Sequence, residues 1–387
     1  MDQMHKLAEL GQFMDVEIAE EGPPAPGQAA APPAAVTAEG CPIHRAAMPN
    51  GQRISLLKTV LTSACERNCN YCAFRAGRDF RRQTFKPDEL ARQFEQMARA
   101  GLVEGLFLSS GVAGGAVRTQ DRLLDTAEIL RLRQGYTGYL HLKIMPGAER
   151  DQVLRAMQLA DRVSVNLEAP TGQRLQALAP QKVLMTELLQ PLRWVEEIRR
   201  TLPAAQGWKG RWPSSTTQFV VGGVGENDAE LLRATDYLYH QLRLKRAYYS
   251  GFHPVQGTPL EGHPAVDPWR SHRLYQASFL LRDYGFDLED FDFDPRGFLA
   301  LGQDPKTAWA QAHLSGQPLE INRAGLAQLL RIPGIGPRGA RTILASRRKA
   351  PLHRVEDLKA LGIQVGRAAP FILIDGRRPP LQLSLFG

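Results

Sequence analysis

The segment ISLLKTVLTSACERNCNYCAF, residues 54–74, joins an apolar strand pattern to three closely spaced cysteines. Cys65, Cys69 and Cys72 follow the strand with the spacing Cys-x3-Cys-x2-Cys. A short loop can turn three such thiolates toward one metal centre. Four thiolates would fill a cubane iron–sulfur cluster, whereas three leave one iron open to another ligand. The segment therefore predicts a metal centre at the end of a strand.

Two plainer interpretations of these cysteines remain open. Cys41 and His44 lie upstream as Cys-Pro-Ile-His and could supply a further ligand to a zinc site. Alternatively, the three cysteines are reduced structural residues. Because neither alternative explains the strand before the cysteines or the pattern after them, we favour the iron–sulfur centre.

Composition limits the class of protein. The 387 residues suffice for one large domain and a smaller one, and 43% hydrophobic with 23% charged residues is ordinary for a soluble protein. No apolar run reaches the length needed to span a membrane, and the first residues lack a secretion signal. Four cysteines argue against a disulfide framework. We therefore predict a cytoplasmic protein with no membrane partner.

The positive charge is concentrated near the C-terminus. Residues 318–387 hold 12 Lys and Arg against 4 Asp and Glu, so the preceding 317 residues hold 36 of each sign. This asymmetry predicts that the C-terminal part meets a polyanion, although a solvated basic face is the alternative. A second basic run follows the cysteines, and it could contact phosphate or be a solvated loop: Arg75, Arg78, Arg81, Arg82 and Lys86.

From residue 54 onward the pattern alternates between strands and helices. Residues 1–40 form a separate N-terminal segment, which we predict to be a disordered linker because residues 22–40 are rich in Pro and Ala. A short amphipathic helix is possible within residues 1–21. The predicted strands are 54–62, 105–110, 139–145, 162–168, 216–222 and 246–252, and the predicted helices are 87–100, 120–134, 148–160, 182–201, 227–243 and 267–284. This alternation indicates parallel strands covered by helices, an α/β domain over residues 41–300.

The cysteine spacing, the strand before it and Tyr71 just before the last cysteine resemble the signature of the radical S-adenosylmethionine (radical SAM) enzymes. The resemblance implies a partial (β/α)6 TIM-like barrel and a [4Fe–4S] cluster held by Cys65, Cys69 and Cys72. It also implies S-adenosylmethionine on the open iron, its reductive cleavage to a 5′-deoxyadenosyl radical, and an external electron donor such as flavodoxin or ferredoxin. The cysteine loop leaves the C-terminal end of the first strand, where α/β barrels carry their chemistry.

The same resemblance nominates contacts to S-adenosylmethionine at other strand ends. Ser109, Ser110 and Gly111 follow the second strand, where the family often has Gly-Gly-Glu; the glutamate is missing, so only a backbone role is implied. Asn166 and Glu168 end the fourth predicted strand, and alternation points both side chains to one face. They suit the ribose hydroxyls or the methionine amino group.

Two further residues are nominated for the adenine. Gly223 lies in the glycine-rich end of the fifth strand, VVGGVGENDAELL, where backbone could approach the ring. Tyr71 is a candidate for packing against adenine, with core filling as the alternative. A glycine-rich strand-to-helix turn is also common in other α/β folds.

A second motif lies within residues 318–350, PLEINRAGLAQLLRIPGIGPRGARTILASRRKA. Two helical patterns flank residues 332–336, and the arrangement resembles a helix-hairpin-helix DNA-binding motif. Glycines permit a tight turn, and amides at a helix N-terminus attract phosphate. The resemblance predicts a small all-α domain over residues 318–387, with an ordinary αα-hairpin as the alternative. The predicted nucleic-acid contacts are Gly334, Ile335, Gly336, Arg338 and Arg341.

A cluster-bearing barrel followed by this hairpin resembles a family of bacterial radical SAM proteins associated with DNA modification or repair. That family implies that the hairpin holds a polynucleotide, which we expect to be DNA, while the barrel attacks a nucleotide. The alternatives are a tRNA- or rRNA-modifying radical SAM enzyme, a radical enzyme acting on a small molecule, and a DNA-binding iron–sulfur redox sensor. The sequence leaves open the base attacked, the fate of S-adenosylmethionine, the role of Cys41 and the oligomeric state.

Overall fold

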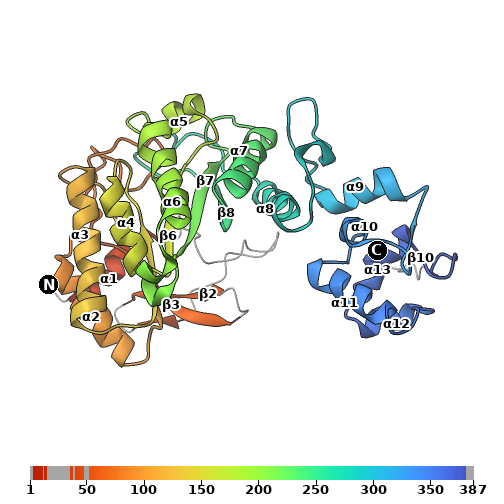
Figure 1. The fold of residues 1–387 in the computed structure, drawn as a ribbon. Helices are drawn as coiled ribbons and strands as arrows, with labels where there is room; N and C mark the ends of the chain where they lie inside the picture. Colours follow the sequence, from red (N-terminus) through yellow and green to blue (C-terminus); the bar gives the residue numbers. More distant parts are fainter. Residues whose placement is uncertain (1–2, 12, 15–34, 38–39, 48–51, 381–387) are drawn as a thin grey trace. The chain divides into compact units, whose positions relative to one another are not determined.

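The computed structural model describes residues 3–11, 13–14, 35–37, 40–47 and 52–380 (Figure 1). The chain forms two compact units. The barrel unit comprises Met1–Glu226 and Tyr237–His272, and the C-terminal unit comprises Asn227–Asp236 and Arg273–Gly387. No helix among the described residues is long and apolar enough to cross a membrane.

Six parallel strands form the curved sheet of the barrel unit, in chain order along the sheet. Their apolar runs pair in register: Leu57 lies opposite Leu106, and Leu142 opposite Val163. These side chains are buried because helices cover the outer face of the sheet while the barrel interior covers the other. The predicted partial (β/α)6 TIM-like barrel is therefore confirmed. The strands are β3 Arg53–Val60, β4 Gly105–Ser109, β5 Tyr139–Lys143, β6 Arg162–Ser164, β7 Ser214–Val221 and β8 Arg246–Gly251.

Helices α2, α3, α4 and α6 lie side by side along the outside of the barrel (Figure 1). Helix α2 shows how the sequence favours a helix that packs against the sheet. It begins with Pro87, whose fixed φ suits the first helical position, and it buries Leu90, Phe94 and Met97, which recur on one helical face. The helices between or after the strands are α2 Pro87–Arg99, α3 Ala116–Glu128, α4 Arg150–Leu159, α5 Gly172–Leu178, α6 Gln190–Thr201, α7 Asp228–Gln241 and α8 Pro268–Asp283.

The N-terminal part of the chain extends this sheet. Strand β2 (Pro42–Ala47) pairs antiparallel with β3, and β1 (Ala35–Val36) pairs antiparallel with β2. Helix α1 (Gln3–Gly11) buries Leu7 and Leu10. Helix α1 confirms the amphipathic helix expected within residues 1–21, whereas the linker prediction is wrong for β1, which is part of the sheet. Most of the Pro/Ala-rich stretch, residues 15–34 and 38–39, lies outside the described residues.

Two predicted helices contain π-helical segments that their apolar pattern did not indicate. Segment η2 (Ile129–Arg133) continues α3, and η3 (Leu184–Leu189) leads into α6. A π segment adds a residue to a turn and so re-aims the side chains that follow it. Three short 3₁₀ turns complete the connections: η4 Ala204–Gln206, η5 Trp208–Gly210 and η6 Leu288–Asp290.

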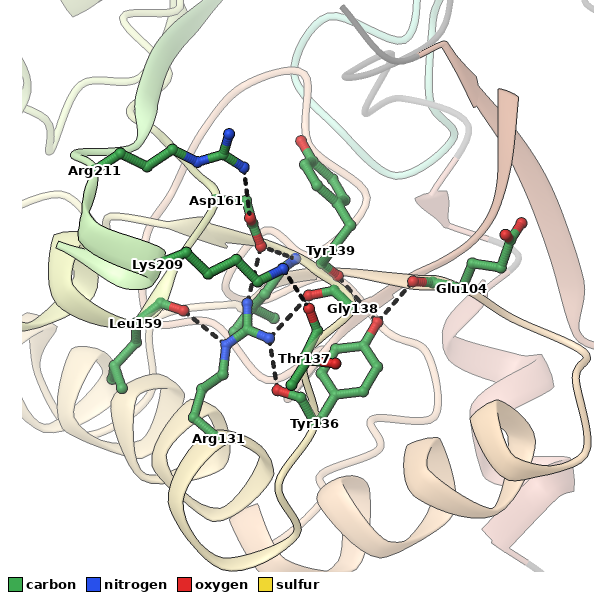
Figure 2. A network of polar contacts seen from close by, with 11 residues as sticks. Glu104, Arg131, Tyr136, Thr137, Gly138, Tyr139, Leu159, Asp161, Lys209 and Arg211 are labelled. Carbon is green, nitrogen blue, oxygen red and sulfur yellow. Dashed lines mark hydrogen bonds and ion pairs between the residues drawn. The ribbon is translucent and has the colours of Figure 1, made fainter. Parts of the chain in front are cut away.

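Segment η2 directs Arg131 into a buried polar network (Figure 2). The guanidinium donates to the carbonyl oxygens of Leu159 at 2.9 Å and of Tyr136 and Gly138 at 2.8 Å, and to Asp161 Oδ2 at 2.9 Å. These partners precede β5 and β6, so the network lies at the strand ends opposite the cysteine loop. Burial is the main effect on Arg131 and lowers its pKa, against the attraction of Asp161. We assign this network to stability, which is what the N-terminal end of such barrels supports.

The C-terminal unit is helical apart from one short strand pair. Strand β9 (Leu319–Glu320) pairs parallel with β10 (Ile372–Leu373), which amends the predicted all-α composition. The core also includes Ala310 and Leu314 of α9, so this unit begins before residue 318. Its other elements are α9 Pro305–Leu314, α10 Leu326–Arg331, α11 Pro337–Arg347, α12 Val355–Ala360, α13 Val365–Ala368 and η7 Ala369–Phe371.

Candidate active site

A cavity opens at the C-terminal ends of the parallel strands of the barrel unit. It encloses about 1050 Å³ including its open mouth. Each of the six strands, or the loop directly after it, supplies lining residues. Representatives in strand order are Val60, Ser109, Lys143, Asn166, Val220 and Ser250. The cavity therefore occupies the place where α/β barrels concentrate their chemistry.

All three cysteines of the loop after β3 line this cavity. Cys69 is buried, and Cys65 and Cys72 are half-buried. Burial raises the pKa of Cys72 to about 12, with a smaller contribution from Cys69, and burial also raises the pKa of Cys69. The thiols of Cys69 and Cys72 are thus harder to ionise than an exposed cysteine, and a cation bound there would displace their protons.

Arginines after the cysteines hold the loop together from within. The Arg82 guanidinium donates to the carbonyl oxygens of Ser63, Phe74, Arg75 and Arg78 at 2.8–3.2 Å. Arg75 donates to Asn68 and Asn70, and Arg78 donates to Ala73 and Gln256. Arg75, Arg78 and Arg82 therefore hold the loop together in this structure, and contact of this basic run with phosphate stays a prediction.

The loop after β4 packs tightly against the cysteine loop. The Gly111 N–H donates to the Thr62 carbonyl at 2.8 Å, and a Cβ on Gly111 would lie 2.3 Å from the Ala64 carbonyl oxygen. Only glycine fits this approach. Ser109 and Ser110 are buried beside it, and all three nominated residues line the cavity.

Asn166 and Glu168 both reach the cavity, but strand alternation does not place them there. Strand β6 ends at Ser164, and Glu168 has a left-handed φ of 65°. Its Oε1 accepts from Lys182 Nζ at 2.9 Å, and the side chains are 4% and 10% exposed. Glu168 Oε2 is buried without a hydrogen-bond partner at standard distance among the described residues.

Lys182 is a cavity residue that the sequence did not predict. It lies between α5 and η3, where no strand end or motif marks it. Burial by itself would lower its pKa, but the neighbouring Cys69 and Glu168 raise it, so the ammonium stays charged. Only its ion pair with Glu168 marks Lys182 as a cavity residue, and that pairing is seen in the three-dimensional structure and not in the sequence. Phe13 and Met14 were missed for a similar reason, since they belong to the segment predicted as linker.

Of the two residues nominated for adenine, only Tyr71 lines the cavity. Burial raises its pKa well above the usual value, and Glu168 raises it further. Gly223 does not line the cavity: a Cβ there would meet Leu178 at 3.2 Å and Phe252 at 3.4 Å.

The glycine-rich turn that contains Gly223 is built around a carboxylate of its own. The N–H groups of Gly222 and Val224 donate to the fully buried Glu226, which also pairs with Arg270 at 3.7 Å. The amides of Gly222 and Val224 are therefore already satisfied within the turn, which the glycine pattern alone did not reveal.

The predicted hairpin of the C-terminal unit is a turn, residues 332–336, between α10 and α11. Gly334 has a φ of 81°, and a Cβ there would lie 2.5 Å from the Gln364 carbonyl oxygen. Ile335 is buried and its N–H donates to the Ile332 carbonyl at 3.2 Å, so its side chain belongs to the core and its amide is already engaged. Gly336 caps α11, on which Arg338 and Arg341 are exposed.

The donor set of the cavity fits an iron–sulfur cluster and a polar cosubstrate. Thiolates are the usual ligands of such clusters, and three of them face a space large enough for both groups. The buried Glu168 Oε2, which has no hydrogen-bond partner at standard distance among the described residues, offers an acceptor to an added donor. Cys41 and His44, the zinc alternative, do not line the cavity. Among the described residues, no three His, Cys, Asp or Glu side chains converge as ligands of a single metal ion.

A half-barrel with three cysteines at the mouth defines the class of protein, and comparison of the sequence with protein families agrees. The model of the radical SAM superfamily matches residues 59–238. The chain therefore contains a radical SAM domain. Domains of this superfamily use a [4Fe–4S] cluster and S-adenosylmethionine, and the three cysteines and the cavity of this domain fit that pair of cofactors.

Solved structures of similar fold include methylornithine synthase (PylB), with 13% identity, TM-score 0.48, and 59% of this chain and 61% of that chain covered. HydG from Carboxydothermus hydrogenoformans, a hydrogenase maturase, has 12% identity, TM-score 0.46, and coverage of 59% and 51%. A radical SAM methyltransferase from Sphaerobacter thermophilus has 17% identity, TM-score 0.43, and coverage of 62% and 70%. The chain thus spans less than two thirds of the length of methylornithine synthase and of HydG. No curated protein matches the sequence.

Proposed function

We propose that this radical SAM enzyme acts on nucleic acid, with DNA as the substrate that it modifies or repairs. The observation that carries the proposal is the exposed pair Arg338 and Arg341 at the start of α11. They are three residues apart on one helix and so share a face. Neither forms an ion pair with another residue in the described ranges, which leaves both available to phosphate.

The charge of the surrounding chain supports the same partner. Residues 318–387 carry an excess of eight positive charges, from 12 basic and 4 acidic residues. Contacts of this kind fix a protein on a phosphate backbone without reading bases. The proposal therefore predicts binding that depends strongly on salt and weakly on sequence, with residues 332–341 acting as the helix-hairpin-helix.

Within the barrel, each cavity residue has a proposed part. Cys65, Cys69 and Cys72 would hold the cluster. When bound, the cluster and S-adenosylmethionine supply one-electron cleavage that produces a hydrogen-abstracting radical. The backbone of residues 109–111 and the side chains of Asn166 and Glu168 would receive the polar groups of S-adenosylmethionine, and Tyr71 would pack against its adenine. Lys182 would hold the Glu168 carboxylate in place through their ion pair at 2.9 Å.

The substrate must reach this cavity. A base in a duplex would have to leave the stack, which costs a few kcal/mol and least for a damaged base. Because a damaged base needs less free energy to leave the stack than an intact one, we favour repair over modification of an intact base. The electron that starts it would come from an external carrier of the flavodoxin or ferredoxin type, and the cytoplasm, where such carriers occur, is the proposed location.

Anaerobic incubation of the reconstituted, reduced enzyme with DNA and with RNA, followed by mass analysis of the nucleosides, tests the proposal. We expect a DNA nucleoside of altered mass that depends on S-adenosylmethionine. A modified RNA nucleoside instead would transfer the proposal to RNA. Cleavage of S-adenosylmethionine with both polymers unchanged would overturn the nucleic-acid substrate and favour a small molecule.

A further inference from the structure

The C-terminal unit contains a second pocket, separate from the barrel cavity and formed entirely by its own residues. It encloses about 800 Å³ including its open mouth. One wall is the turn of residues 332–336, and the other comes from α8, α9 and the start of α13. Charged side chains enter it from two of these helices, because Lys306 and Arg367 both line it.

Lys306 is the unusual member of this pocket. Its side chain is more than nine-tenths buried, at 8% exposure. Its Nζ donates to the Ile335 carbonyl at 2.6 Å and lies 4.5 Å from the centre of the Tyr284 ring. It forms no ion pair with any residue that the structure describes. A buried ammonium without a counter-ion is costly, since a carbonyl and a ring replace only part of its hydration.

The other charges of the pocket do not compensate Lys306. Asp304 lies near it, but that carboxylate accepts from Arg367 at 2.7 Å and from the Thr307 hydroxyl at 2.7 Å. The pocket therefore carries two cations and one anion, an excess of one positive charge. Arg367 is 49% exposed, so it stands at the mouth while Lys306 stands inside.

We propose that this pocket is a phosphate-binding site, in which Lys306 is the buried cation and Arg367 the cation at the entrance. The turn at Gly336 contributes the adjoining N-terminus of α11, which favours an anion. The ligand is a phosphate group, either of a polynucleotide backbone or of a free phosphorylated compound. The site goes beyond the proposed function, because it stands whichever of these two sources supplies the phosphate.

Binding of an anion in this pocket should be coupled to protonation of Lys306, which makes the affinity depend on pH. The pKa of Lys306 is lowered to about 7, mainly by burial and secondarily by the charge of Arg367, while the charge of Asp304 opposes both. Tyr284, the remaining titratable group against Lys306, has a pKa raised by burial and then by Asp283, so it stays neutral. A bound anion favours the charged lysine, and binding therefore takes up a proton above pH 7. Affinity should fall about tenfold per pH unit once the pH exceeds the pKa of Lys306.

Titration of the full-length holoenzyme with inorganic sulfate, followed calorimetrically, tests the site. Sulfate remains a dianion across this pH range, so only the protein titrates. We expect saturable binding at about pH 6 that weakens roughly tenfold by about pH 8. Lys306→Met should abolish it, whereas Lys359→Met, which removes an exposed lysine from the same unit, should leave it unchanged. Lys306→Arg should bind at both pH values, because arginine does not titrate there.

No saturable sulfate binding, or equal binding by Lys306→Met, would overturn the site. Retained pH dependence in Lys306→Arg would assign the effect to another group and overturn it as well. Inorganic phosphate and a short DNA duplex, each in competition with sulfate, separate the two sources. Displacement by DNA identifies the backbone as the ligand. If inorganic phosphate displaces sulfate and DNA does not, the pocket binds a free phosphorylated compound, and it no longer supports a nucleic-acid substrate.

Discussion

Glu168 combines an unfavourable backbone conformation with a buried charge at the centre of the cavity. A non-glycine residue in the left-handed region costs of order 1–3 kcal/mol, and such strain persists only where surrounding contacts impose it. Here the Glu168 N–H donates to the Gln218 carbonyl at 3.0 Å, and Lys182 holds the carboxylate. The residue is thus fixed before any ligand arrives, which is the property expected of a group that orients a cosubstrate.

Replacement of Cys69 by alanine tests the cluster at the scale of one atom. Because Cys69 is buried in the cavity, Cys69→Ala should lower the iron content and reduce S-adenosylmethionine cleavage to background, with DNA affinity unchanged. Release of 5′-deoxyadenosine, measured chromatographically, is the readout. Cys41→Ala is the matched control, since Cys41 is equally buried but does not line the cavity. Persistent 5′-deoxyadenosine from Cys69→Ala would contradict the cluster assignment.

Among the elements, the loop after β4 determines how closely the cysteine loop can pack. Gly111→Ala would force a Cβ to 2.3 Å from the Ala64 carbonyl oxygen, so one of the two loops must move. We expect a loss of about 1–3 kcal/mol in the free energy of unfolding. Iron incorporation should fall in parallel. Denaturant unfolding and iron analysis measure the two effects.

Gly172→Ala serves as the comparison for that variant. Gly172 opens α5, and a Cβ there would meet nothing within 4 Å. The alanine should be neutral or slightly stabilising, because it reduces the freedom of the unfolded chain. If both alanine variants behaved alike, close packing at Gly111 would not be what holds the loop.

The Arg131 network offers a test at the other end of the barrel. Arg131→Met removes a fully buried guanidinium and leaves Asp161 and three carbonyls short of donors. We expect about 3–5 kcal/mol of lost stability. Arg133→Met, on the same π segment but exposed, should stay within about 0.5 kcal/mol. If chemical denaturation gave the same loss of stability for both variants, the buried contacts of Arg131 would not stabilise the barrel more than an exposed arginine does.

The sequence predicted those elements whose patterns are periodic, and missed features that depend on distant partners. All six parallel strands are apolar runs that pack on both faces, so each was recognised within a few residues. Strand β6 is shorter than predicted: it ends at Ser164, and Glu168 rejoins the sheet through a bridge to Phe219 with a left-handed φ, which no local pattern encodes. The place of Lys182 depends on Glu168, and the place of Gly223 depends on the carboxylate of Glu226. Ile335 was nominated for its motif, but its side chain completes the core.

For the molecule as a whole, the proposal separates catalysis in one unit from anchoring in the other. Arg338→Gln with Arg341→Gln should weaken DNA binding about equally for all sequences and lower the salt dependence by about two units of slope. Cleavage of S-adenosylmethionine without DNA should not change. Arg92→Gln with Arg99→Gln, which removes two exposed charges from α2, is the control. Fluorescence anisotropy at several salt concentrations measures DNA binding by both double variants. Equal binding by the two variants would contradict the role of Arg338 and Arg341.

Substitution at the hairpin glycine is a poorer test of the same claim. A side chain at Gly334 would meet the Gln364 carbonyl and would require a left-handed φ, so Gly334→Asp should destabilise the C-terminal unit itself. Lost binding in that variant would not distinguish lost phosphate contact from lost fold. The exposed arginines avoid this difficulty because their side chains support no core.

Strand β3, which leads into the cysteine loop, is hydrogen-bonded along both edges, antiparallel to β2 and parallel to β4. Each of its amides that is hydrogen-bonded belongs to one of these two ladders, and neither edge of the strand faces solvent, so these amides should exchange among the slowest in the barrel unit. Removal of iron should quicken exchange in residues 65–74 and leave β3 protected. A chain that has lost its cluster would then keep the framework for receiving another, and repair of the metal centre would not require the protein to refold.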